Sequence, residues 1–496
     1  MQIEFLLLII SILFFASIIV SKASSRFGVP VLLLFLAVGM IFGVDGFGIQ
    51  FDSIRVAQVI GTVALCIILF SGGMDTKLSD VKPIIGPGVM LATIGVFITA
   101  FVTGFVIWII MDKTSIGTNI GLLCSLLLAA TISSTDSASV FSILRSKGLH
   151  LKNNLKPTLE LESGSNDPMA YVLTITLISL ANQGGSPQYL TAVMNLFIQL
   201  IVGAVAGYCL GKALVWLINR LKIENESLYP ILVLSSCIFI FAVTYYMQGN
   251  SYLAVYIGGL IFGNSKFVHK RSTRNFFDGI SWLSQLVMFL TLGLLVNPSE
   301  LNFHYIILPS LIISAVMILL SRPLAVFISL LPFKRYRFRD RVFVSWCGLR
   351  GAVPIIFAIL CRAENVPHAD TIFNIVFCCT LVSLVLQGTT LPLMARWLKV
   401  EDEAPKQNKI ENFDIDFPEE IKSATSEIEM TPQILSHGNL LMDLRMPEKT
   451  LAIMVKRGEN YFVPTGKTHL MVGDKLMVIT DNNEALEQTL KQLSDN

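Results

Sequence analysis

Four ionisable side chains lie inside strongly apolar stretches of the sequence, where a charge is costly unless it is paired or solvated. Three are acids, Asp136, Glu162 and Asp167, and the fourth is Arg350. Carboxylate, hydroxyl and carbonyl oxygens suit a hard cation, and a carboxylate can also bind and release a proton. These residue types therefore predict movement of a cation, a proton or both through a membrane.

Two of these side chains lie where a helix is expected to break. Asp136 belongs to the polar run 133–139, and Arg350 lies in the Gly- and Pro-containing run 348–354. Such breaks are tolerated at membrane depth only where they line a cavity. Inverted-repeat transporters place two broken helices of opposite direction at an ion site near the bilayer midplane, so we expect the two runs to cross there.

The other two acids belong to the motif Glu162-Ser163-Gly164-Ser165-Asn166-Asp167-Pro168. Ser163 and Asp167 share one helix face, as do Glu162 and Asn166, because residues four apart are neighbours on a helix. Asp167, Ser163, Asp136 and freed backbone carbonyls could hold the cation. Two alternatives stay open: Asp136 could only stabilise the helix break, and Asn166 could only hydrogen-bond another helix.

The composition indicates a membrane protein. Hydrophobic residues make up 53% of the 496 residues, charged residues 15%, and the mean hydropathy is +0.67, whereas soluble domains carry charge on about a quarter of their residues. Thirteen transmembrane helices are predicted, with the first kept as a span because it lacks the features of a removable leader. They cover approximately 3–20, 28–44, 54–73, 84–111, 117–144, 157–181, 189–219, 228–247, 251–264, 274–296, 304–333, 341–361 and 371–398.

Basic residues predict the orientation, because Lys and Arg are retained in cytoplasmic loops. The loops after odd-numbered segments contain nineteen of them, and the loops after even-numbered segments contain only Arg55, Lys113 and Arg362. We therefore expect the N-terminus outside, the C-terminus in the cytoplasm, and a multi-pass protein of the cell inner membrane surrounded by lipid.

The last hundred residues differ from the rest. Residues 1–400 carry a net charge of +10 and residues 401–496 a net charge of −8. We predict a transmembrane domain over 1–400, an acidic linker over 401–422, and a small α+β cytoplasmic domain over 423–496. Short apolar runs separated by turn residues follow one another there at 440–444, 451–455, 461–463 and 475–479, and a helix-like pattern at 483–493 ends the chain.

At these motifs the chain resembles the NhaP-type branch of the monovalent cation:proton antiporters. The resemblance rests on five runs: 69–75, Thr135-Asp136, Glu162 to Pro168, 346–354 and 387–390. It implies a homodimer of thirteen-helix chains with crossed unwound helices, exchanging Na⁺ or K⁺ for H⁺ by alternating access. It also implies that Asp167 binds the cation and proton, helped by Ser163, Asn166, Thr135 and Asp136, and that Glu162 and Arg350 form a structural ion pair.

The chain departs from that family's pattern at two positions. Ser71 stands where the glycine-containing motif often has a carboxylate, and Ser137 follows Thr135-Asp136 where proline is common. The tail resembles the TrkA C-terminal (RCK-C) domain of potassium-transport regulators, through the runs 444–447 and 472–474. That resemblance implies a small effector, in some cases a nucleotide such as a cyclic dinucleotide, and it favours K⁺ over Na⁺. A passive folded cap is the alternative.

Other function classes lack their sequence features. A potassium channel or uptake subunit regulated by such a tail would need a carbonyl-lined filter, and no Thr-Val-Gly-Tyr-Gly run occurs. An enzyme would need a catalytic motif, and no His-Glu-x-x-His, Walker loop or nucleophile elbow occurs. We therefore expect a secondary transporter with no cofactor, no metal beyond the transported cation, and no nucleic-acid partner. Asn166 stands beside Asp167 where electrogenic relatives carry two adjacent aspartates, so the resemblance also implies electroneutral exchange.

Overall fold

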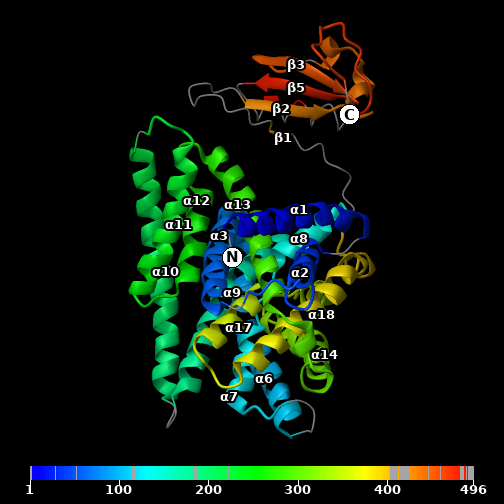
Figure 1. Ribbon diagram of the computed structural model, residues 1–496. Coiled ribbons are helices and arrows are strands. Elements are labelled where there is room, and N and C mark those ends of the chain that lie inside the picture. The colour runs from blue at the N-terminus through cyan, green and yellow to red at the C-terminus, as the bar shows by residue number, and fades with distance from the viewer. Residues whose placement is uncertain are drawn as a thin grey trace. The chain divides into compact units, whose positions relative to one another are not determined.

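The structure is a computed structural model, shown in Figure 1. It describes residues 3–27, 30–51, 53–113, 118–183, 188–221, 223–402, 411–412, 424–444, 446–458, 460–480, 485–486 and 489. The chain divides into two compact units, Met1–Asp402 and Glu403–Asn496. Helices build the first unit, and the second contains one small sheet.

Two sets of helices make up the first unit. The set that we call the scaffold bundle consists of α1 (Ile3–Phe27), α2 (Val31–Phe42), α3 (Ile54–Asp75), α10 (Tyr189–Arg220), α11 (Leu228–Tyr246), α12 (Ser251–Asn264) and α13 (Lys270–Leu295). The set that we call the core bundle consists of α4 (Leu78–Val81), α5 (Ile85–Met90), α6 (Val96–Lys113), α7 (Leu122–Thr131), α8 (Ser137–Ser146), α9 (Leu155–Asn182), α14 (Leu308–Val316), α15 (Arg322–Ser329), α16 (Phe338–Trp346), α17 (Val353–Ala363) and α18 (Ala369–Trp397). The bundles meet where α9 packs on α10 and α12, and where α3 packs on α17.

When consecutive helices that continue one another are counted together, the described part of the first unit contains thirteen helical segments. Each of them overlaps one of the predicted segments. Seven are long and apolar enough to cross a bilayer as single helices, including the composite helices Leu78–Lys113 and Phe303–Ser329. The predicted fold class, a polytopic helical membrane protein with interrupted helices, is confirmed. In Figure 1, α1 runs crosswise, whereas α10 and α11 run lengthwise. That residues 3–20 span the membrane stays a prediction.

Glycine residues bring α12 close to the helices on both sides of it. A Cβ on Gly259 would lie 3.0 Å from the Cα of Phe70 in α3, and one on Gly207 of α10 would lie 2.7 Å from the Cα of Ala254. Small residues allow such close approach of helix backbones in membranes. The ridge of Gly203, Gly207 and Gly211 on α10 therefore packs within the scaffold bundle against the α12 region.

The second unit contains an antiparallel sheet in the order β1-β2-β5-β3-β4. Its strands are β1 (Glu411–Asn412), β2 (Ala424–Glu429), β3 (Thr450–Arg457), β4 (Asn460–Phe462) and β5 (Lys475–Thr480). The central strand β5 buries Leu476, Val478 and Thr480, the period of two that a half-buried strand shows.

Three of the four apolar runs predicted in the tail overlap strands, whereas the run at 440–444 lies mostly in a 3-10 turn (Leu441–Leu444). The predicted linker contains the two residues of β1, and most of its other residues lie outside the described part. The helix predicted over 483–493 likewise falls largely outside the described residues. The described part of the tail thus has the sheet expected of a small α+β domain.

Candidate functional site

The first helix break lies between α7 and α8. The segment 132–136, which contains the first part of the polar run, separates the two helices, and Asp136 caps the start of α8. Its Oδ1 accepts a hydrogen bond from the N–H of Ser139 at 3.1 Å, and its Oδ2 accepts one from the Ser139 hydroxyl at 2.5 Å. Asp136 therefore stabilises the broken helix end, one of the roles left open for it, while it stays within reach of the crossing.

The second helix break, between α16 and α17, crosses the first one. The N–H of Asp136 donates to the carbonyl of Leu349 at 2.8 Å, and Arg350 Nη1 donates to the carbonyls of Ser133 and Ser134 at 2.5 Å each. A Cβ on Gly351 would lie 2.9 Å from the Cβ of Asp136, so only glycine allows this approach. Arg350 thus satisfies carbonyls that the broken α7 leaves without helical partners.

Helix α9 brings three of the predicted residues to this crossing. Ser163 Oγ donates to the carbonyl of Thr135 at 2.8 Å, and Asn166 Nδ2 donates to Thr135 Oγ1 at 2.5 Å. Asp167 Oδ1 accepts a hydrogen bond from Ser134 Oγ. Asp167 is buried, with 7% of its surface exposed. The structure therefore gathers Asp167, Ser163, Asn166, Thr135 and Asp136 around one point.

Ser134, the hydrogen-bond partner of Asp167, was not predicted as a site residue. It lies inside the polar run that marked the first break, so its presence near the site was foreseeable. Its contact with Asp167 was not, because it depends on how the irregular backbone at 133–136 turns its side chains toward α9.

The predicted ion pair between Glu162 and Arg350 is wrong in its basic partner. Glu162 Oε1 lies 2.5 Å from Nη2 of Arg322, at the start of α15, and these side chains are 1% and 3% exposed. Arg322 is buried beside the second break, where a Cβ on Gly348 would lie 2.9 Å from its Nε. Arg350 is instead directed at the carbonyls of the first break.

Helix α18 holds both sides of the second break. Ser383 Oγ accepts a hydrogen bond from the N–H of Arg350 at 2.9 Å and donates to Gln387 Oε1 at 2.5 Å. Gln387 Nε2 donates to the carbonyl of Trp346, the last residue of α16, at 3.0 Å, and Trp346 Nε1 donates to Thr390 Oγ1 at 3.1 Å. The motif at 387–390 therefore positions the crossing without contributing to the group of oxygens around Asp167.

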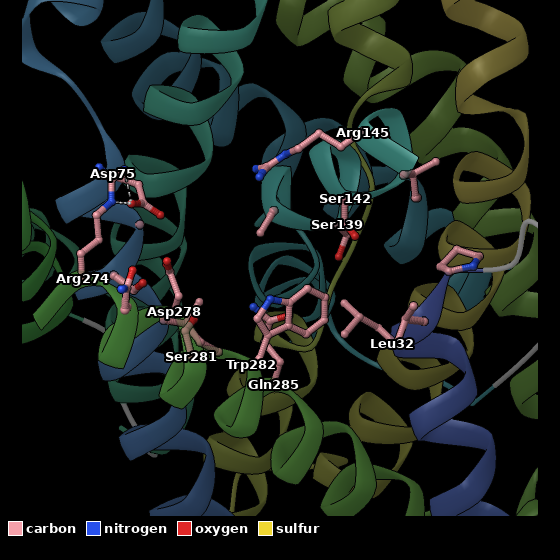
Figure 2. Close-up of a pocket in the computed structure, with 18 residues that line it drawn as sticks. Leu32, Asp75, Ser139, Ser142, Arg145, Arg274, Asp278, Ser281, Trp282 and Gln285 are labelled. Carbon is pink, nitrogen blue, oxygen red and sulfur yellow. Dashed lines mark hydrogen bonds and ion pairs between the residues drawn. The ribbon is translucent and has the colours of Figure 1, made fainter. Parts of the chain in front are cut away.

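A cavity of about 690 Å³, which we call the Arg274 cavity, opens beside the crossing (Figure 2). Arg274 of α13 and Asp75 of α3 form an ion pair on its wall, with Nη2 and Oδ1 2.7 Å apart. Arg145 extends into it from α8, opposite Asp278. The cavity also reaches Ser139, whose hydroxyl donates a hydrogen bond to Asp136. The Ser139 side chain therefore lies between this cavity and the site.

A second cavity, which we call the Tyr252 cavity, has a volume of about 550 Å³. It lies along the C-terminal half of α9, from Tyr171 to Asn182, whereas the Arg274 cavity lies along α8. Its lining includes Tyr252 of α12, Phe357 of α17 and Glu364. The crossing with Asp167 therefore lies between two cavities on different sides of the bundle.

Two broken helices that cross at a buried carboxylate, within a bundle of apolar helices, define a multi-pass membrane secondary transporter. The transmembrane sodium/hydrogen exchanger family matches residues 10–397, and the chain belongs to this family. It is therefore a monovalent cation:proton antiporter and not an enzyme, and exchange rather than channel conduction is the confirmed function.

Curated relatives agree with this assignment, and a solved structure shares the fold. The K(+)/H(+) antiporter NhaP of Alkalimonas amylolytica is 41% identical over 404 residues, covering 81% of this chain and 68% of the relative. The K(+)/H(+) antiporter NhaP2 of Shewanella baltica is 39% identical over 493 residues, covering 97% and 82%. The structure of the sodium proton antiporter MjNhaP1 from Methanocaldococcus jannaschii has the same fold, with a TM-score of 0.66 at 24% identity, over 78% of this chain and all of that one.

Proposed function

We propose that cation and proton compete for the carboxylate of Asp167. The observation that carries this proposal is the arrangement of the crossing. One buried carboxylate, which accepts a hydrogen bond from Ser134, lies at the same crossing as oxygens of Thr135, Ser163 and Asp136. The Arg350 guanidinium donates its hydrogen bonds to backbone carbonyls of the first break and so stabilises the backbone there. A hard monovalent cation is stabilised by such an oxygen set, and a proton on Asp167 replaces it when the cation leaves.

The exchange is one proton for one cation, and therefore electroneutral. The residue beside Asp167 is Asn166, whose amide binds Thr135 and cannot exchange a proton. One carboxylate that alternates between a proton and a monovalent cation moves no net charge in a full cycle. The preferred cation is K⁺, because the relatives from Alkalimonas amylolytica and Shewanella baltica are named K(+)/H(+) antiporters.

The two cavities provide access to Asp167 from opposite sides of the membrane in turn. The excess of Lys and Arg in the loops after odd-numbered segments supports a cytoplasmic opening for the Arg274 cavity, which contains Arg145 and Arg274. The Tyr252 cavity then opens outside. In this orientation the chain is an inner-membrane protein with its N-terminus outside and its C-terminus in the cytoplasm, and it works as a homodimer.

The tail is a regulatory domain of the RCK-C type. Its compact five-stranded sheet and its own apolar core support a domain that folds around a function separate from the site. A small nucleotide is the effector class that the resemblance suggests. The described residues of the oxygen set around Asp167 all come from the first unit, so we expect the tail to change the rate or pH dependence of exchange rather than supply a ligand.

Flux measurements in proteoliposomes test the proposed site. We expect K⁺-driven proton movement whose rate is unchanged when a membrane potential is imposed, and no exchange in Asp167→Asn, because an amide can neither release a proton nor neutralise the cation. Repeating the assay with Na⁺ measures the ion preference. Substantial exchange in a well-folded Asp167→Asn protein, or a rate that follows the potential, would overturn the single-carboxylate mechanism.

A further inference from the structure

One face of α12 in the scaffold bundle touches α9 of the core bundle next to Asp167. The amide Nδ2 of Asn250, the residue that caps α12, donates a hydrogen bond of 2.7 Å to the carbonyl of Pro168. Pro168 directly follows Asp167 in α9. A side chain of one bundle is therefore bonded to the backbone that carries the proposed exchange site in the other bundle.

Asn250 is firmly held on its own side of this contact. Its N–H donates to the carbonyl of Gln199 in α10 at 2.9 Å, and its Oδ1 accepts from the N–H of Leu253 at 3.1 Å. A Cβ on Gly203 of α10 would lie 3.0 Å from the Asn250 nitrogen, so the absence of a side chain there permits the contact. Asn250 is fully buried. The Asn250 amide oxygen thus caps α12, and its amide nitrogen donates a hydrogen bond to α9.

Two tyrosines of α12 also contact α9. The ring of Tyr252 meets that of Tyr171 in α9 edge-on, with ring centroids 4.6 Å apart. The ring of Tyr256 covers Gly164, where a Cβ would lie 2.5 Å from its Cζ. Tyr171 and Tyr252 both line the Tyr252 cavity, and Tyr171 lies one helical turn beyond Asp167. The contact between Tyr171 and Tyr252 therefore lies where that cavity approaches the site.

We propose that Asn250 is a positioning residue that latches the core bundle to the scaffold bundle, favouring the state in which Asp167 is closed to the Tyr252 cavity. This inference rests on the proposed exchange at Asp167 by alternating access. When α9 moves relative to α12 to open the Tyr252 cavity, the Asn250–Pro168 hydrogen bond must break. A hydrogen bond present in only one of two states shifts their populations toward that state, and an ordinary one shifts them by about three- to tenfold.

Asn250→Ser separates the latch from the cap. Serine at an N-cap accepts the bond from N–H groups of the first turn about as well as asparagine does, but it has no amide to donate to Pro168. The adjacent variant Ser251→Ala is the matched control, because Ser251 is also buried at the start of α12 and its hydroxyl has no hydrogen-bond partner among the described residues.

The readout is the apparent KM for K⁺ on each face of uniformly oriented vesicles. Apparent affinity from one face falls with the fraction of protein open to that face. In Asn250→Ser we expect the KM on the face of the Tyr252 cavity to fall about three- to tenfold and the KM on the other face to change less than about twofold. Ser251→Ala should match the parent on both faces.

An active Asn250→Ser protein with parental KM values on both faces would show that Asn250 only caps α12, and it would overturn the latch. If this variant does not fold, Tyr171→Leu tests the same contact line from α9 and should change the two KM values in the same directions; unchanged values there would also overturn it. If Asp167 is not the exchange site, the result is different: exchange would survive in Asp167→Asn, independently of the KM values measured for the Asn250 variant.

Discussion

Removing one partner of the buried Glu162–Arg322 pair should destabilise the protein strongly. Both side chains are almost fully buried and their charged atoms lie 2.5 Å apart, so Arg322→Met leaves the Glu162 charge without a partner or water. Breaking such a pair typically costs about 3 to 5 kcal/mol. The exposed Lys212 of α10 provides the control, since Lys212→Met removes the same charge at the surface, where substitutions usually change stability by about 0.5 kcal/mol or less.

A double-mutant cycle identifies the true partner of Glu162. The cycle compares the parent with three variants: Glu162→Gln, Arg322→Met and the double variant. Each protein is unfolded reversibly by SDS in mixed micelles, and its helix content is followed by circular dichroism. Residues in direct contact show coupling of about 0.5 to 3 kcal/mol, and for this buried charge pair we expect a value at the upper end. The parallel cycle of Glu162→Gln with Arg350→Met should give less, because Arg350 donates to backbone carbonyls that remain in every variant.

The comparison of the two cycles decides the assignment. Stronger coupling of Glu162 to Arg350 than to Arg322 would refute the pairing that the structure shows. A loss of stability in Arg322→Met no greater than in Lys212→Met would refute the reasoning about buried charge itself.

Two further predictions concern the tail. Deleting residues 423–496 should leave exchange intact but change its dependence on pH or on an added cyclic dinucleotide, measured by flux and by equilibrium binding to the full chain; complete loss of exchange by a well-folded truncated protein would contradict it. The guanidinium of Arg457, which donates to both carboxylate oxygens of Asp474, holds the pKa of Asp474 below its usual range. The stabilisation by this pair is therefore present at pH values above the ordinary Asp pKa of about 3.9, and it is lost as the pH falls through the lower folded pKa. Asp474→Asn should accordingly speed amide hydrogen exchange of β5 at pH 7 and make little difference at the lowest pH. Equal exchange rates of parent and variant at pH 7 would contradict this.

The sequence by itself determined the membrane class and the segments, and it predicted where the chemistry takes place. Long apolar stretches leave few places for a charge, so Asp136, Glu162, Asp167 and Arg350 were conspicuous without any structure. Glycine, proline and clustered hydroxyl residues spoil a helix locally, so both breaks were also predictable from their own residues. Four-residue spacing placed Ser163 and Asp167 on one face of α9. All of this information is local to a segment.

Only the tertiary structure decided which side chains meet across segments. Arg322 and Arg350 both follow Glu162 by well over a hundred residues, and the sequence does not say which of them lies beside it, because the rotation and depth of each helix depend on its packing against the others. The same reason hid the contacts of Ser134 with Asp167 and of Asn250 with Pro168. These contacts join elements that are far apart in the chain or turned by an irregular backbone, and they depend on glycine-mediated approaches that no local pattern encodes.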